Sequence, residues 1–194
     1  MIAPPAMVAG GYGVVLCDPP WRFFNYSAAG EAKNPVAHYR CETTDDIIGL
    51  AKEIGLDFLC APDCALAMWA TFPMLPDALR VMAAWGFAYK SGGAWGKTTK
   101  AGGPAFGTGY IYRSVAELWL LGTRGSPKVL SHSVRNLILA ERQEHSRKPG
   151  QMQDDLEKLY AGPYLELFAR RPRVGWTTWG LEADAGASTA EATA

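Results

Sequence analysis

Residues 14–21 of the chain read Val14-Val15-Leu16-Cys17-Asp18-Pro19-Pro20-Trp21. The first four form a short apolar run with two β-branched members, which is typical of a buried strand rather than a helix. The prolines cannot continue that strand, because proline has no N–H to donate and its ring fixes φ. Asp18 is therefore expected at the carboxyl end of a central strand, the edge of an open α/β sheet at which ligands bind.

A carboxylate followed by Pro-Pro-Trp suits the methylation of a planar amine. The 6-amino nitrogen of adenine is a poor nucleophile, because its lone pair is delocalised into the ring. Asp18 and the carbonyl of Pro19 can accept its two hydrogens, which directs the lone pair at an electrophilic methyl group. Pro20 brings no competing N–H, and Trp21 offers a stacking surface worth about 1–3 kcal/mol per base. The simpler alternative is an ordinary Asp-Pro turn beside a core tryptophan, but the complete string favours a site.

The string Asp18-Pro19-Pro20-Trp21 resembles the signature of the DPPW-type, MT-A70-like adenine amino-methyltransferases, and the similarity is closest to the short bacterial and phage members. It extends from about Tyr12 to Glu182. Four further motifs stand in the family's order: Ala67–Thr71, Leu121–Gly125, Glu144–Pro149 and Leu165–Arg170. The resemblance implies an α/β, Rossmann-like methyltransferase fold with a mostly parallel central sheet, flanking helices and a permuted motif order. It also implies S-adenosyl-L-methionine-dependent methylation of the 6-amino group of adenine in nucleic acid, with DNA expected over RNA.

The methyl donor is expected near the strand that begins at Leu165. The sequence shows no metal or flavin constellation, whereas a sulfonium cofactor needs mainly in-line positioning and exclusion of water. Glu166 is placed to accept from the ribose hydroxyls or the amino group of the cofactor. Phe168 is placed to pack on its adenine, and Arg170 to pair with its carboxylate. By pattern alone, Glu166 is an ordinary surface residue that alternates with core leucines.

The resemblance adds residues to this cofactor site. In related enzymes with permuted order, a Lys-Pro pair opens the helix before the cofactor strand, and Lys148-Pro149 stands in that position. The cofactor contacts implied or expected are Asp18, His145, Ser146, Lys148, Glu166, Phe168 and Arg170, with Arg124 a weaker candidate. From the residues alone, His145 and Ser146 fit a polar loop that caps the helix. The family's Gly-Asn near the C-terminus is replaced by Gly180-Leu181, so one polar contact to the cofactor ribose is missing.

Two segments are expected to meet the substrate. Residues 22–40 are polar and contain Asn and Gly, as binding loops often do. Residues 96–109 are rich in glycine but lack the strand and helix of a dinucleotide site, so a mobile substrate loop is the favoured interpretation. The expected catalytic residues are Asp18, Pro19, Pro20 and Trp21. The expected substrate contacts are Trp21, Tyr26, Lys97, Lys100 and Arg113.

Composition sets broad limits. The chain has 194 residues and a formal net charge of zero, which argues for one globular domain without a large phosphate-binding surface. Residues 124–173 nevertheless carry ten Lys or Arg and six Asp or Glu, an excess that fits either a nucleic-acid backbone or a solvated face. Four cysteines without framework spacing, no signal-peptide pattern and no long apolar run predict a cytoplasmic protein without metal or membrane span.

Periodicity places the elements along the chain. Residues 1–11 are expected to be a loose arm, 12–182 the methyltransferase domain and 183–194 a disordered tail. Helices are predicted from a cap at Thr43 to Gly55, from Pro73 to Trp85, and from Pro149 to Gly162. The strands predicted after the first are Ala65–Ala70, Phe87–Tyr89, Ala94–Trp95, Glu117–Leu121, Asn136–Ala140 and Leu165–Ala169.

Other functions remain open from the sequence. One alternative is a catalytically silent nucleic-acid-binding subunit, although such a subunit has no need of Asp18. Others are a methyltransferase acting on RNA or on a small-molecule amine. A homodimer or a partner subunit is equally compatible with the sequence, and the recognition sequence is not readable from it.

Overall fold

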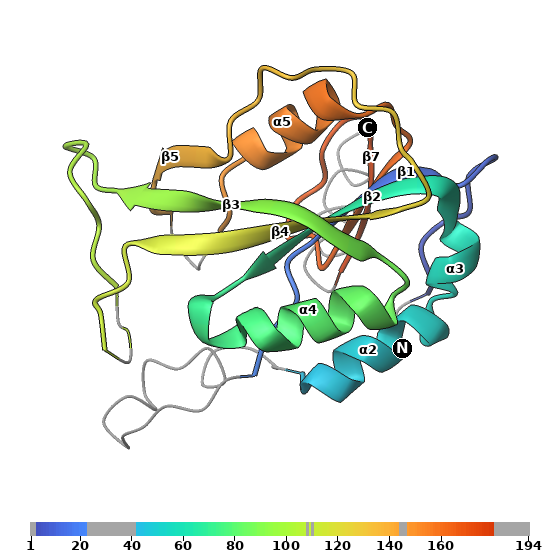
Figure 1. Ribbon diagram of the computed structural model, residues 1–194, viewed down its shortest axis with the longest axis horizontal. Helices are drawn as coiled ribbons and strands as arrows, with labels where there is room; N and C mark the ends of the chain where they lie inside the picture. Colours follow the sequence, from blue (N-terminus) through green and yellow to red (C-terminus); the bar gives the residue numbers. More distant parts are fainter. Residues whose placement is uncertain (1–2, 23–41, 108, 110, 144–146, 181–194) are drawn as a thin grey trace, which may run out of the picture.

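The computed structural model describes residues 3–22, 42–107, 109, 111–143 and 147–180. In this part of the chain, seven strands form one sheet in the order β5-β3-β4-β2-β1-β6-β7 (Figure 1). The strands are β1 (Tyr12–Cys17), β2 (Cys60–Ala70), β3 (Ala88–Thr98), β4 (Ala116–Arg124), β5 (Leu137–Glu141), β6 (Tyr164–Leu167) and β7 (Trp176–Trp179). Among these strands, only β4 is antiparallel to its neighbours. The predicted α/β fold with a mostly parallel sheet is therefore confirmed, and it is consistent with a Rossmann-like methyltransferase.

The first strand lies inside the sheet, as residues 14–17 predicted. It pairs in parallel with β2 on one side and with β6 on the other, and Cys17 is in register with both Met68 and Leu167. Asp18 therefore leaves the sheet between the carboxyl ends of two parallel neighbours. This is the position at which open α/β sheets hold their ligands.

Helices cover both faces of the sheet (Figure 1). Helices α2 (Thr44–Glu53), α3 (Leu56–Leu59) and α4 (Leu75–Ala84) pack on one face, where Val15 and Cys17 belong to their apolar core. Helix α5 (Gln151–Leu159) covers the other face with Met152 and Leu156, which pack in a second core that includes Val14 and Leu16. The strand's side chains thus alternate between two cores, which is why this run has no polar position.

Local signals explain where the helices begin. Thr43 and Asp46 form the predicted capping box of α2, and Gly55 follows the helix with a φ of 70°. The helix predicted from Pro73 starts instead as a 3-10 turn over Phe72–Met74, and α4 begins at Leu75. None of the described helices is long and apolar enough to cross a membrane.

Strand β3 corrects the sequence-based prediction. Two short strands were expected, Phe87–Tyr89 and Ala94–Trp95, and the residues between them include Gly92 and Gly93, which are poor strand formers. The structure has one continuous strand whose glycines lie against β4, and a side chain at Gly93 would collide with the Trp119 ring and the Asn136 carbonyl. The glycines permit a close approach rather than a break. The glycine-rich segment expected as a loop from residue 96 therefore begins inside this strand and leaves it only after Thr98.

The two ends of the described chain lie together. Strand β7 was not predicted, because Trp176–Trp179 is only four residues long, yet it extends the sheet beyond β6. The segment expected as a loose arm is attached to the domain from residue 3 onward. The Trp179 indole donates to the Ala3 carbonyl at 2.7 Å, and the Tyr12 hydroxyl donates to the Ala6 carbonyl at 2.6 Å. Residues 183–194, predicted to be disordered, lie outside the described part.

Candidate active site

Asp18 is held by a lysine from a distant part of the chain. Lys148 stands just before α5, and its Nζ lies 2.9 Å from both carboxylate oxygens of Asp18. The side chains are 20% and 15% exposed, so the ion pair is largely withdrawn from water. The Lys-Pro motif therefore reaches the carboxylate of the Asp-Pro-Pro-Trp motif directly, and two predicted site motifs meet.

The ion pair is part of a row of four alternating charges. Lys148 Nζ also lies 2.9 Å from Oε1 of Glu117, at the start of β4, and Lys97 Nζ lies 2.9 Å from the other oxygen of Glu117. We call Asp18, Lys148, Glu117 and Lys97 the charged row. Because β4 is antiparallel, its beginning lies at the same edge as the carboxyl ends of β1, β2 and β3. The row therefore follows the ligand-binding edge of the sheet.

Two tryptophans support the row. Lys148 Nζ lies 5.7 Å from the ring centroid of Trp69, and Lys97 Nζ lies 5.0 Å from that of Trp95. The two rings meet edge to face with centroids 6.3 Å apart, and both are about 1% exposed. An indole face attracts a cation, and more strongly where water is excluded. The aromatic pair thus helps to hold two ammonium groups that have little access to solvent.

Burial and neighbouring charges set the pKa values in the row. Burial raises the pKa of Asp18, and the charge of Lys148 only partly offsets this effect. Burial also acts to raise the pKa of Glu117, but the attraction of Lys148 and then of Lys97 outweighs it, so that pKa is lowered. For Lys148, burial acts to lower the pKa, whereas Asp18 and Glu117 raise it well above its usual range. Lys148 is thus a fixed cation, and Asp18 is the more basic of the two carboxylates.

The cofactor strand β6 brings a second carboxylate to this edge. Glu166 accepts a hydrogen bond from Gln153 Nε2 at 3.1 Å. Burial raises the pKa of Glu166 to about 7, and the nearby Asp18 adds to the shift. Glu166 is therefore not the exposed strand residue that the alternating pattern favours. It is a carboxyl group on the strand next to Asp18, and its pKa lies near neutral pH.

Phe168 directly follows β6 in an unusual conformation. Its φ is 61°, a left-handed backbone value that few residues other than glycine adopt. Its ring meets that of Trp179 edge to face, with centroids 5.9 Å apart. Strained residues of this kind are common at binding sites, where the surrounding structure holds them in place. Arg170 follows within two residues, and its charge lowers the pKa of Asp18.

The donor set fits S-adenosylmethionine. This cofactor carries an ammonium, a carboxylate, a ribose diol and an adenine. The β1 and β6 ends provide two carboxylates in Asp18 and Glu166, a cation in Arg170, and an aromatic ring in Phe168. The buried Thr71 Oγ1, which follows β2, also has no hydrogen-bond partner in the described structure. In the same residues, no group of three or more His, Cys, Asp or Glu is placed to hold a metal ion.

The Pro-Pro-Trp part of the motif is fixed by the backbone. The Trp21 N–H donates to the Pro19 carbonyl at 2.8 Å, and the Pro20 carbonyl accepts from the Glu42 N–H at 2.9 Å. The Trp21 indole donates to the Trp69 carbonyl at 2.9 Å, and the residue is 6% exposed. Trp21 thus ties the motif to β2 in the structure, and its predicted role as a stacking surface stays a prediction.

The predicted substrate residues are spread out. Lys97 is engaged in the charged row, whereas Lys100 lies in an exposed turn. Arg113 is exposed and donates to the Gly107 carbonyl at 3.0 Å. Tyr26, and with it the expected binding loop, lies outside the described residues, as do His145, Ser146 and Leu181.

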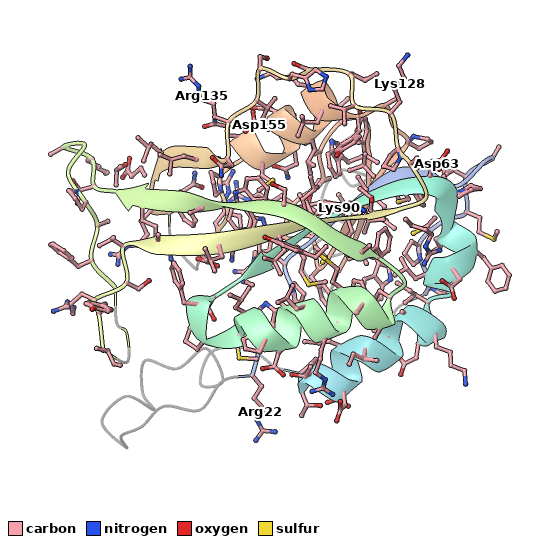
Figure 2. The ribbon with its side chains drawn as sticks, in the orientation of Figure 1. Arg22, Asp63, Lys90, Lys128, Arg135 and Asp155 are labelled. Carbon is pink, nitrogen blue, oxygen red and sulfur yellow. The ribbon has the colours of Figure 1, made fainter. Side chains whose placement is uncertain are left out.

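Arg124 does not join the site. It ends β4 at the opposite edge of the sheet, where its guanidinium pairs with Asp57 at 2.8 Å and donates to the Trp85 carbonyl. The weaker expectation of a cofactor contact is therefore wrong, because β4 runs antiparallel. Lys128 and Arg135, also within the basic stretch, are exposed, and both side chains point outward on the α5 side (Figure 2).

Glu117 is the site residue that the sequence analysis missed. It was assigned only to a strand. The signal in the sequence was a carboxylate at the start of an otherwise apolar run, Glu117 to Leu121. In the structure, residue Glu117 as a whole is 9% exposed. A buried carboxylate is normally paired with a cation, so a carboxylate in an apolar strand already indicated a Lys or Arg partner. The partners, Lys97 and Lys148, lie 20 and 31 residues away and were not identifiable without the sheet order.

Comparisons with known proteins identify the family of the chain. The MT-A70 family model matches residues 12–182. The type II methyltransferase M.MunI of Mycoplasma sp is 28% identical, over 92% of this chain and 80% of that protein. The N6-methyladenosine RNA methyltransferase MTA1 of Pyricularia oryzae is 32% identical, over 89% of this chain and 47% of that protein. An N(6)-adenosine-methyltransferase MT-A70-like protein of Arabidopsis thaliana is 28% identical, over 89% of this chain but 24% of its own length. The chain belongs to the MT-A70 family of adenine N6-methyltransferases.

Proposed function

We propose that this protein transfers a methyl group from S-adenosyl-L-methionine to the 6-amino group of adenine in DNA. The observation that carries the proposal is Asp18 at the carboxyl end of β1, buried and with a raised pKa, next to the cofactor strand β6. A basic, desolvated acceptor at a ligand-binding edge is what activation of a weak amine nucleophile requires.

Asp18 and Pro19 prepare the amine. The carboxylate accepts one amino hydrogen, and the Pro19 carbonyl accepts the other through the lone pair that the Trp21 N–H leaves free. S-Adenosylmethionine, when bound, supplies a methyl group already activated by its sulfonium. The nitrogen lone pair forms the new N–C bond, and the C–S bonding pair stays with sulfur. The proton that the alkylated nitrogen then loses passes to Asp18 or to water.

The cofactor is held by residues of β6 and of the Lys-Pro motif. Glu166 accepts from the ribose hydroxyls or the amino group, Phe168 packs on the adenine and Arg170 pairs with the carboxylate. His145, Ser146 and Lys148 are assigned to the same site on the family resemblance. Glu166 binds best when it is ionised, so the cofactor affinity is expected to depend on pH near 7.

DNA is favoured over RNA on two grounds. The motifs of the chain resemble those of the short bacterial and phage members of the family. The chain also spans four fifths of the bacterial type II methyltransferase, but under half of the fungal RNA methyltransferase.

The substrate is expected to be unpaired. Extruding adenine from a duplex costs a few kcal/mol, and least where the base is mismatched or single-stranded. A chain with a net charge of zero has limited means to offset that cost.

The test is transfer of labelled methyl groups to oligonucleotides of one sequence. Single-stranded, mismatched and fully paired DNA are compared with single-stranded RNA at several salt concentrations. We expect the single-stranded and mismatched DNA to react fastest, with rates that fall as salt rises. A clear preference for RNA would contradict the choice of DNA. A preference for perfect duplex would mean that a second copy or a partner subunit supplies the missing contacts.

A further inference from the structure

Lys148 occupies the place that the substrate needs. Its ammonium lies 2.9 Å from each oxygen of Asp18, so it stands in front of the carboxylate that must accept the adenine amino group. An ammonium has three donors, and those of Lys148 are directed at Asp18 and Glu117. Adenine can therefore reach Asp18 fully only if Lys148 gives up part of its contact with this residue.

Glu117 offers Lys148 a second position. Its Oε1 lies 2.9 Å from the same Nζ, while its Oε2 is engaged by Lys97. The side chain of Glu117 is 11% exposed, and its lowered pKa keeps it ionised at neutral pH. A cation that leaves Asp18 thus finds a carboxylate without crossing into water, and it stays near the Trp69 ring.

We propose that Glu117 is a positioning residue for methyl transfer, which takes over the Lys148 ammonium when the adenine amino group replaces it at Asp18. The proposal rests on the proposed function, since it needs an amine at Asp18. Without Glu117, Lys148 would have to keep its contact with Asp18 or remain buried without a partner. Removing one partner of a buried pair is strongly destabilising, so the lysine would keep Asp18 blocked.

The charges around Asp18 give the proposal a signature in the free protein. The groups that act on it are Lys148 and Arg170, which lower its pKa, and Glu117, which raises it. Glu166 is coupled to it as well, because Asp18 raises the pKa of Glu166. Loss of the Glu117 charge therefore lowers the pKa of Asp18, whereas loss of Lys148 raises it.

The first experiment compares three variants by steady-state methyl transfer. Glu117→Gln removes the second carboxylate but leaves Lys97 unpaired. The double variant Glu117→Gln with Lys97→Met restores the charge balance of the row. Asp57→Asn is the matched control, because Asp57 also pairs with a cation, Arg124, at 2.8 Å, but at the opposite edge of the sheet. Thermal unfolding of each variant shows whether it is folded.

We expect kcat to fall roughly 10- to 100-fold in both variants that lack Glu117, the factor that corresponds to one hydrogen bond to a charged group. The cofactor affinity of the variants without Glu117 should stay within about twofold of wild type, and so should the turnover of Asp57→Asn. Glu117→Asp should restore part of the loss. If the double variant regains the wild-type kcat, Glu117 merely balances the charge of Lys97, and the proposal is wrong.

The second experiment needs no turnover. The carboxyl carbon of Asp18 is followed by NMR through a pH titration of the free protein. We expect its pKa to fall in Glu117→Gln and to rise in Lys148→Met. Shifts in the same direction, or none, would overturn the charged row as described, even if wild type methylates adenine. If instead the titrations behave as expected but wild type transfers no methyl to adenine, the proposed function fails and the geometry stands.

Discussion

The two edges of the sheet both carry ion pairs, but they differ in exposure to water. At the edge where β1 and β6 end, the four side chains of the charged row are 11–21% exposed. At the opposite edge, Arg124 pairs with Asp57 at 2.8 Å, and this carboxylate is 83% exposed. A further pair, Arg173 with Asp154 at 2.6 Å on helix α5, has a carboxylate that is 51% exposed. Distances alone do not distinguish the two edges.

The exposure of an ion pair to water determines how much it contributes to the stability of the fold. A solvent-exposed ion pair contributes only about 0–1 kcal/mol, because water already solvates both groups. A buried pair gains more attraction but loses more solvation, and apolar residues of the same volume would often stabilise a protein equally well. The charged row loses solvation free energy on burial, so the stability of the fold alone does not explain its presence. We infer that it is retained for the chemistry at Asp18, whereas the opposite edge contributes only to the fold.

The largest expected contrast is in turnover. Asp18→Asn removes the acceptor for the adenine amino group, and we expect kcat to fall about 10²- to 10⁴-fold, the usual range for a proton-accepting residue. Asp57→Asn, the same chemical change at the opposite edge, should leave kcat unaltered. Steady-state methyl transfer to single-stranded DNA measures both. Similar losses in the two variants would indicate a general effect on folding.

The next contrast is in stability. Lys148→Met leaves Asp18 and Glu117 buried as neighbouring carboxylates, and we expect the free energy of unfolding to fall by about 3–5 kcal/mol, the usual cost of breaking a buried pair. Arg173→Met breaks a more exposed pair and should cost clearly less. Urea unfolding at pH 7 checks both values. An equal loss in the two variants would remove the distinction between the buried charged row and the more exposed ion pairs.

The raised pKa of Glu166, at the carboxyl edge, predicts that the free energy of unfolding depends on pH. Its pKa rises from 4.5 to about 7 on folding, so the folded state binds more protons than the unfolded state between these values. Its contribution to stability therefore falls as the pH rises from about 4.5 to 7 and is constant above that. Glu166→Gln should remove this component. The unfolding free energies of wild type and variant are measured from pH 5 to 8. Their difference isolates the contribution of Glu166 from those of the other carboxyl groups.

The same group should affect cofactor binding. Because ionised Glu166 accepts stronger, charge-assisted hydrogen bonds than its protonated form, we expect the affinity for S-adenosylmethionine to rise several-fold between pH 6 and 8. Calorimetry without nucleic acid measures this. The rise should be absent in Glu166→Gln, and a rise that persists there would locate the titrating group elsewhere.

The smallest effect is expected at Arg124. Arg124→Gln breaks a pair with an exposed carboxylate, so we expect a loss of about 1 kcal/mol or less in unfolding free energy. Turnover and cofactor affinity should not change. A weakened cofactor affinity in this variant would restore Arg124 to the site and contradict its position at the far edge.

The sequence predicted the parts of this site that are local. Residues 14–21 were sufficient to place Asp18 at a strand end, because an apolar run and two prolines determine where that strand stops. The capping box at Thr43 was readable for the same reason. In both cases the signal and the structure involve neighbouring residues.

What the sequence did not predict depends on contacts between distant elements. The direction of β4 determines that Glu117 lies at the site and Arg124 does not, and nothing within the strand encodes that direction. The continuity of β3 depends on the Trp119 ring, which only its glycines can approach. The ion pair between Lys148 and Asp18 joins residues 130 positions apart. Family resemblance assigned Lys148 to the site, but not its partner.

The most direct test of the account is the identity of the methylated atom. Wild type and Asp18→Asn are incubated with S-adenosylmethionine and single-stranded DNA, and the digested nucleosides are separated by mass spectrometry. The account predicts N6-methyladenine as the product of wild type and its near absence with Asp18→Asn, while that variant still binds the cofactor and unfolds cooperatively. A methyl group on another base or atom, or undiminished N6-methyladenine from Asp18→Asn, would contradict it.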